Sequence, residues 1–412
     1  MGPTSLRRVR VLLFTGKGGV GKTTAAAGSA IRAGRSGLRT LVVSTDAAHS
    51  LADAFDQQIG PEPTAVGDQV WVQQVDTQRR FERSWADLQG YLLSVLDASG
   101  VDPIAAEELT VLPGADEVLA LLEVRDQVAT GEWDVVIVDC APTAETLRLL
   151  ALPEALSGYV ERVFPVERRV IKALRPMLAR VAGVPMPHDS VFDAVERLHR
   201  DLGEVRDLLT GPDASVRLVL TPESVVVAEA RRAFTSLSLY GYRVDGVVAN
   251  RIFPAAESDP WRGQWVVAQQ EVLAEVERSF APLPIWRSAY RAHEPVGDAE
   301  LAAFGAELYG DDDAFAPVVG DGPVRVERKG DDVRMSLALP FADRGDVDLV
   351  RRGRDLVVTV GSYRRVIALP TLMQRCSVEG ARLDDGWLRI RFRHEREATD
   401  TASVAAGGVE SR

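Results

Sequence analysis

The first three hundred residues alternate short apolar runs with longer stretches of helical periodicity. The apolar runs are rich in β-branched residues and are nearly continuous, which is typical of parallel strands covered on both faces. We therefore predict buried strands within residues 8–14, 39–46, 134–142, 216–222 and 244–251. Strands that alternate with helices indicate an α/β fold with a mostly parallel sheet.

Two regions interrupt this alternation, because the helical patterns of residues 77–130 and 144–210 are too long for simple crossovers. We predict that both regions form a helical subdomain on the sheet. Within 156–181, apolar residues recur at three- or four-residue steps, with one break: Leu156, Val160, Val163, Val170, Leu174, Met177 and Val181. Such stripes usually pack against one another; the alternative is a groove for an amphipathic or transmembrane helix.

The hydrophobic period changes from helical to two near residue 330. Before the change, residues 311–322 are acidic and rich in glycine and proline, which indicates a linker after a first domain at 1–310. Beyond it, Val333, Met335 and Leu337 alternate with polar residues, which predicts a small antiparallel β-sandwich over 323–395. Small and polar residues follow at 396–412, where we expect a flexible tail.

Composition agrees with a two-domain protein and excludes several partners. The chain has 412 residues, of which 46% are hydrophobic and 26% charged, and a net charge of −12. This acidic balance argues against nucleic acid or an anionic membrane surface as the main partner. The early apolar run at 11–14 is short and leads into a glycine loop, so we interpret it as a strand rather than a signal peptide.

Cysteine usage and hydropathy point to the same kind of protein. The two cysteines, Cys140 and Cys376, are far apart in sequence, which excludes a disulfide scaffold and a four-cysteine metal site within one chain. No stretch approaches the roughly 18 uncharged apolar residues of a membrane span. We therefore expect a cytoplasmic protein without an integral membrane segment.

Residues 16–23 read GKGGVGKT and fit the P-loop pattern G-x-x-x-x-G-K-[ST] between a predicted strand and a predicted helix. Glycines let successive backbone N–H groups converge on phosphate oxygens, and the helix adds its positive N-terminus. Lys22 is expected to neutralise the β- and γ-phosphates of ATP, and the Thr23 hydroxyl to bind Mg²⁺. The predicted nucleotide-binding residues here are Gly16, Lys17, Gly18, Gly19, Val20, Gly21, Lys22, Thr23 and Thr24.

Two carboxylates end predicted strands and complete the candidate site. Asp139 follows four apolar residues, the usual position of a carboxylate that holds Mg²⁺ through water. Asp46 ends another strand; we predict that it positions the attacking water or acts as a general base, beside a possible contact to Mg²⁺. The alternative for Asp46 is a helix N-cap. A carboxylate in such a position needs a cation or water, because burying it unpaired is costly.

Lys17 is a second lysine in the loop, and the P-loop pattern does not require it. From the tip of the loop its side chain points away from its own phosphates. Two interpretations are open: the lysine is a solvated loop residue, or it reaches a group that sits opposite the loop.

Five stretches of the chain read GKGGVGKTT, DAAHSL, PGADEVLALLEV, DCAPTAETLRLL and VVANRIFP. Together they resemble the ArsA family of ATPases, which includes the arsenite-pump ATPase and the ATPase that targets tail-anchored membrane proteins. By position, Lys17 resembles the lysine that acts on the nucleotide of a facing subunit, and Asp46 the switch I carboxylate. Asp139 resembles the switch II carboxylate and Asn250 the residue that reads adenine. With one P-loop per chain, the resemblance implies a homodimer that meets through the nucleotide-site faces.

The C-terminal part resembles the α-crystallin domain of small heat-shock proteins. The family signature appears at Ala381, Asp385, Gly386, Leu388 and Ile390. Departures concern the first domain: switch I has Ala47 where many ArsA members have proline, and switch II has Ala144 and Glu145 where Gly-His is common. The second departure bears on how switch II couples to the helical subdomain.

The sequence therefore predicts a homodimeric, Mg²⁺-dependent ATPase whose cycle opens and closes a site for hydrophobic helices or membrane-protein segments. The alternative is the ATPase subunit of an arsenite or antimonite pump, although such metalloids need clustered thiolates. A third class, the partitioning or cell-division ATPases, binds DNA or membranes, which the acidic charge opposes.

Overall fold

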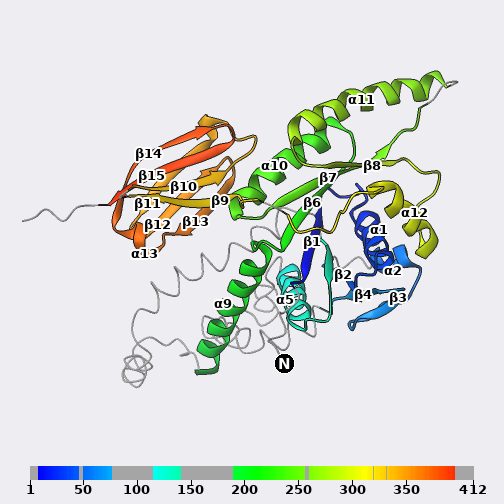
Figure 1. Ribbon diagram of the computed structural model, residues 1–412, viewed down its shortest axis with the longest axis horizontal. Helices are drawn as coiled ribbons and strands as arrows, with labels where there is room; N and C mark the ends of the chain where they lie inside the picture. Colours follow the sequence, from blue (N-terminus) through cyan, green and yellow to red (C-terminus); the bar gives the residue numbers. More distant parts are fainter. Residues whose placement is uncertain are drawn as a thin grey trace, which may run out of the picture.

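The computed structural model describes residues 8–45, 50–76, 115–140, 189–255, 259–318, 320–330 and 332–394. The N-terminal part of these residues forms an α/β domain, and an antiparallel sandwich lies beside it (Figure 1). Asp46, the expected tail, and most of the expected helical subdomain fall outside the described residues. In the described part, no helix combines the length and apolar character that crossing a bilayer requires.

The α/β domain contains one large sheet, which confirms the predicted fold class. Its described strands are β1 (Arg10–Thr15), β2 (Thr40–Ser44), β3 (Thr64–Gly67), β4 (Val70–Gln74), β5 (Val135–Asp139), β6 (Ala214–Leu220), β7 (Val244–Ile252) and β8 (Ile285–Ala289). Their order is β3-β4-β2-β5-β1-β6-β7-β8, and all neighbours are parallel except β3 and β4. β1 is thus central, between β5 and β6. The five predicted strands are β1, β2, β5, β6 and β7.

Helices cover both faces of this sheet (Figure 1). One face carries α1 (Lys22–Arg35), α2 (Ser50–Phe55) and α12 (Gly297–Tyr309); the other carries α5 (Ala115–Ala129), α9 (Asp189–Leu209), α10 (Ser224–Tyr240) and α11 (Pro260–Phe280). Two glycines let α1 and α12 touch, because a Cβ on Gly28 would lie 2.6 Å from Phe304 and one on Gly305 would lie 2.3 Å from the Gly28 carbonyl oxygen. α12 is thereby fixed against the helix that begins at the P-loop.

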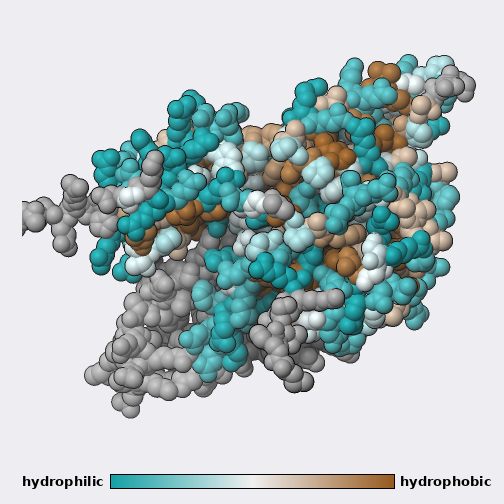
Figure 2. All heavy atoms as spheres, in the orientation of Figure 1, coloured by the Kyte–Doolittle hydropathy of each residue, from teal (hydrophilic) through white to brown (hydrophobic). Residues whose placement is uncertain are grey.

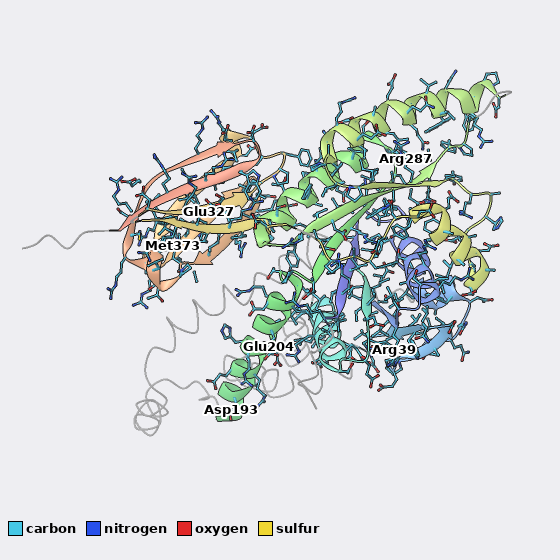
Figure 3. The ribbon with its side chains drawn as sticks, viewed as in Figure 1. Arg39, Asp193, Glu204, Arg287, Glu327 and Met373 are labelled. Carbon is cyan, nitrogen blue, oxygen red and sulfur yellow. The ribbon has the colours of Figure 1, made fainter. Side chains whose placement is uncertain are left out.

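The described part of the expected helical subdomain consists of α5 and α9, which pack together. Arg125 on α5 bonds Glu204 on α9 at 3.0 Å and pairs with Asp201 at 2.9 Å; Glu204 is labelled in Figure 3. The apolar side of α9 is buried, with Leu202 and Val205 each at most 2% exposed. The apolar side of α9 therefore packs within the protein, whereas the stripe predicted at 156–181 lies outside the described residues.

The C-terminal part is the predicted antiparallel sandwich. Its elements are β9 (Val324–Lys329), β10 (Asp332–Ala338), η1 (Arg344–Asp346), β11 (Val347–Arg352), β12 (Asp355–Val360), β13 (Tyr363–Ala368), α13 (Thr371–Gln374), β14 (Cys376–Asp384) and β15 (Trp387–His394). One sheet has the order β14-β15-β10-β9 and the other β11-β12-β13. The predicted alternation is confirmed: Val333, Met335 and Leu337 are at most 3% exposed.

The Asp385–Gly386 signature forms a two-residue turn between β14 and β15. Both residues have positive φ, 48° and 68°, and the flanking residues Asp384 and Trp387 pair across the two strands. A type I′ hairpin turn requires this backbone conformation at both central positions, which explains the residue types.

α10 joins the two parts of the molecule. Leu239 on this helix is fully buried in the core of the sandwich, and its carbonyl oxygen accepts a hydrogen bond from Arg365 Nη1 at 2.6 Å. Phe341, between the sandwich strands, packs against Phe234 of α10 and Phe280 of α11 with ring centroids 6.1 and 5.7 Å apart. Figure 2 shows apolar side chains gathered over α10 and α11 beside the sandwich. The sandwich core is therefore completed by a helix of the α/β domain.

A buried charge network joins strands β1, β6 and β7 of the sheet. Asp245 accepts from Arg10 at 3.0 Å and from Arg217 at 3.3 Å, and Ser215 bonds the same carboxylate at 2.8 Å. Burial lowers the pKa of Arg10 to about 10, although Asp245 partly offsets this effect. Arg217 also donates to the Ala314 carbonyl and so fixes the segment expected as a linker to the sheet.

Candidate nucleotide site

The glycine loop connects the central strand β1 to α1. Gly19 and Gly21 adopt φ angles of 80° and 91°, in the left-handed region that favours glycine. Gly21 precedes α1 without a side-chain cap, so the first N–H groups of this helix are left for a ligand. Lys22 is only 8% exposed, and its Nζ donates to the Lys17 carbonyl oxygen at 3.3 Å. Such a loop at a helix N-terminus is an anion site with phosphate geometry.

Thr23 and Asp139 meet beside this loop. β5 pairs with β1 so that Asp139 lies opposite Phe14, at the carboxyl end of both strands. Thr23 Oγ1 donates to Asp139 Oδ2 at 2.7 Å, and Asp139 is 1% exposed. A hydroxyl and a carboxylate oxygen in contact are the hard donors that Mg²⁺ prefers, so these two predicted residues fit the ion.

The C-terminal end of β2 lies beside Asp139. The backbone N–H of Thr45 donates to the Asp139 carbonyl oxygen at 3.0 Å, and the Thr45 hydroxyl contacts that oxygen at 3.3 Å. Asp46 is the next residue and lies outside the described residues, so its role as water-positioning carboxylate stays a prediction.

Asn250 lies beneath the loop at the end of β7. Its Nδ2 donates to the Val20 carbonyl oxygen at 2.8 Å, its Oδ1 accepts from the Arg251 backbone N–H at 2.9 Å, and the residue is 5% exposed. This contact supports the loop and was not anticipated from sequence. The predicted contact of Asn250 with adenine stays a prediction.

Gly21→Ala is expected to lower the stability of the nucleotide-free protein by about 2–4 kcal/mol. Alanine disfavours the φ of 91°, and its Cβ would lie 2.3 Å from Asn250 Nδ2, which breaks the bond to Val20. Thermal unfolding measures the loss. Gly18→Ala is the matched control, because nothing lies within 4 Å of its Cβ position; equal melting of both variants would contradict the argument.

Lys17 extends from the loop toward α10 rather than back over the loop. Its Nζ lies 3.6 Å from Glu229 Oε2, and the two side chains are 42% and 37% exposed. Both residues line a pocket with Val226, Ala230 and Ala233 of α10. Lys17 could be predicted from the sequence, but Glu229 could not, since nothing near Glu229 in the chain marks it as a partner of the loop.

The two cysteines are in separate places. Cys140 follows Asp139 in the core of the α/β domain, where burial, and then the negative charge of Asp139, raise the pKa of its thiol to about 12. Cys376 is buried in the sandwich core. The described structure therefore does not bring the two thiols together.

A glycine loop between a central parallel strand and a helix, ending in lysine and threonine beside a strand-end carboxylate, defines the class of P-loop nucleotide hydrolases. Comparison with protein families narrows the class. The family described as Anion-transporting ATPase, ArsA, matches residues 9–310, and an HSP20-like domain found in ArsA matches residues 319–392. The chain therefore belongs to the ArsA family of anion-transporting ATPases and is an ATP hydrolase, with an HSP20-like sandwich.

Several curated proteins are similar over most of their length. A putative arsenical pump-driving ATPase of Prosthecochloris vibrioformis is 36% identical, covering 94% of this chain and 97% of that protein. An uncharacterized protein of Streptomyces coelicolor is 37% identical, with 94% and 98% covered. The ATPase get3 of Pyrenophora tritici-repentis is 28% identical over 73% of this chain and 91% of its own length. The predicted resemblance to the family is thus confirmed.

Proposed function

We propose that this protein is a homodimeric, Mg²⁺-dependent ATPase that couples ATP turnover to a binding site for hydrophobic helices, as a chaperone or targeting factor. The observation that carries the proposal is the position of Lys17. This lysine stands at the nucleotide loop, half-exposed, and contacts Glu229 instead of its own loop. A half-exposed cation in that position can reach a second copy whose nucleotide faces it once it leaves Glu229.

Each residue of the nucleotide site has a separate role in ATP hydrolysis. Lys22 and the first N–H groups of α1 hold the phosphates, while Thr23 and Asp139 would hold Mg²⁺. When bound, Mg²⁺ supplies positive charge that neutralises the phosphate oxygens. Asp46 orients the attacking water, and Lys17 of the facing copy stabilises the charge that develops on the transferred phosphoryl group.

Two features support a helical client. The chain carries an HSP20-like sandwich, a domain of chaperone type, attached to its ATPase domain. The predicted helical subdomain borders the sheet through α5 and α9, which contact β5 and β6. β5 ends in Asp139 at the nucleotide site, so a movement of Asp139 can be passed along β5 to these helices.

Client capture is expected to depend on the bound nucleotide. An immobilised peptide with a continuous apolar helical face should retain the wild-type protein to a different extent in ATP and ADP, because only ATP is expected to bring the two copies together. Lys17→Ala should remove this difference. A peptide of equal length whose apolar face is interrupted by aspartates serves as control; equal capture in both nucleotides would contradict the proposal.

The alternative function is the ATPase of an arsenite or antimonite pump. The names of several relatives favour it, among them the putative arsenical pump-driving ATPase of Prosthecochloris vibrioformis. The burial of Cys140 and Cys376 in separate cores opposes it, since soft metalloids bind clustered thiolates. A rise in ATP turnover when arsenite is added would support the pump function.

A further inference from the structure

α10 carries contacts to both the nucleotide loop and the sandwich. Near its N-terminus, Glu229 pairs with Lys17, and Val226 and Ala230 line the pocket against Gly16. Near its C-terminus, Leu239 is buried in the sandwich core. Leu239 follows Glu229 by ten residues, which corresponds to roughly 15 Å along the helix axis.

The sandwich contacts α10 from the middle of the helix to its C-terminus. Tyr240 OH donates to the Arg364 carbonyl oxygen at 3.3 Å, and Thr235 donates its hydroxyl to the Pro340 carbonyl. The Arg231 guanidinium lies 5.6 Å from the centroid of the Phe341 ring. These contacts involve three successive turns of the helix, so the sandwich helps to set the position of α10, together with β6, β7 and α11 of the α/β domain.

The N-terminal half meets Lys17 through a weaker contact. The Lys17–Glu229 pair is about 40% exposed and 3.6 Å long, and such pairs contribute on the order of 0–1 kcal/mol. A lysine that pairs with Glu229 in its own chain has to leave that carboxylate before it can reach a facing copy. A contact of this strength opens readily when one partner shifts.

We propose that Glu229 is a positioning residue for Lys17, and that the sandwich sets the position of Glu229 through α10. The ion pair retains Lys17 in its own subunit, and a displacement of the sandwich moves α10 and releases the lysine. The HSP20-like domain thereby regulates ATP turnover. This inference rests on the proposed function, in which Lys17 acts on the nucleotide of a second copy.

The first test compares Glu229→Gln with wild type in the full-length protein. At subunit concentrations where only a minority of the protein is paired, Glu229→Gln should raise ATP turnover about two- to fivefold and lower the concentration needed for ATP-dependent pairing by a similar factor. In a Lys17→Ala background the same substitution should change neither quantity. A merely structural role of Glu229 would not depend on Lys17.

The second test addresses the sandwich. Phe341→Ala loosens the contact with Phe234 and Phe280 and should reproduce the rise in turnover. Combined with Glu229→Gln it should add nothing, because both changes act on one step. Arg365→Met, which removes the bond to Leu239, provides a second variant if Phe341→Ala folds poorly. Leu372→Ala is the control: its exposed side chain lies on α13, next to Met373, at the end of the sandwich away from α10 (Figure 3).

The outcomes separate the two proposals. If Lys17→Ala leaves turnover intact, the proposed function fails and the inference fails with it. If Lys17→Ala lowers turnover while Glu229→Gln equals wild type, the inference alone is overturned. If Glu229→Gln raises turnover but Phe341→Ala and Arg365→Met do not, the part assigned to the sandwich is wrong.

Discussion

Mixing two inactive variants, Lys17→Ala and Asp139→Asn, is expected to restore ATP hydrolysis to roughly a quarter of the wild-type rate. Alone, each should fall by about 10²–10³-fold, the first through loss of a cation at the developing charge and the second through loss of the carboxylate beside Thr23. In a mixed pair, the Lys17→Ala copy keeps a complete phosphate site and receives Lys17 from the Asp139→Asn copy. Half of randomly formed pairs are mixed, and one of their two sites works.

Phosphate release at constant total subunit concentration measures the recovery. The control replaces the Asp139→Asn partner by the Lys17→Ala/Asp139→Asn double variant, which differs from it only by the missing lysine and should rescue nothing. Recovery that is absent while both variants bind ATP would mean that Lys17 acts within its own chain. The homodimer would then lose its main support.

Asp245→Ala is expected to lower the free energy of unfolding of the α/β domain by roughly 3–5 kcal/mol. The carboxylate lies between two guanidinium groups, with Arg10 and Arg217 at 3.0 and 3.3 Å and side chains that are at most 7% exposed. Without it, two buried positive charges face each other without their common counter-ion. A buried charge that loses its partner costs far more than the intact network contributes.

Urea unfolding followed by circular dichroism measures this loss. Asp298→Ala removes the same charge from a pair with Arg35 at 3.0 Å in which both side chains are more than half exposed. That control should cost at most about 1 kcal/mol, because water already solvates both partners. Equal shifts for the two variants would contradict the role of burial.

The central strands could be predicted from sequence because burial on both faces makes their apolar runs continuous. β3, β4 and β8 were missed, and β8 shows why. In β8 the buried residues Trp286 and Ser288 alternate with exposed ones, and this strand lies at the edge of the sheet. A short alternating run with Arg287 in its centre does not stand out from a loop.

Some residues of the candidate site could also be predicted from sequence and others could not. Thr23 and Asp139 could be identified because a contiguous motif and a strand end mark them, and parallel pairing brings those ends together. Glu229 and the loop contact of Asn250 could not, because each depends on a contact between residues more than two hundred positions apart. The sequence of α10 contains no motif that indicates its role, and only its packing shows that it contacts both domains.

The shared core around Leu239 also has a consequence for synthesis on the ribosome. α10 emerges about 150 residues before the sandwich is completed by β15, so at 5–20 residues per second its sandwich-facing side chains wait roughly 8–30 s for the finished domain. During that interval the apolar side chains of α10 that face the sandwich are exposed to solvent. Its maturation is therefore completed by the last strands to be translated.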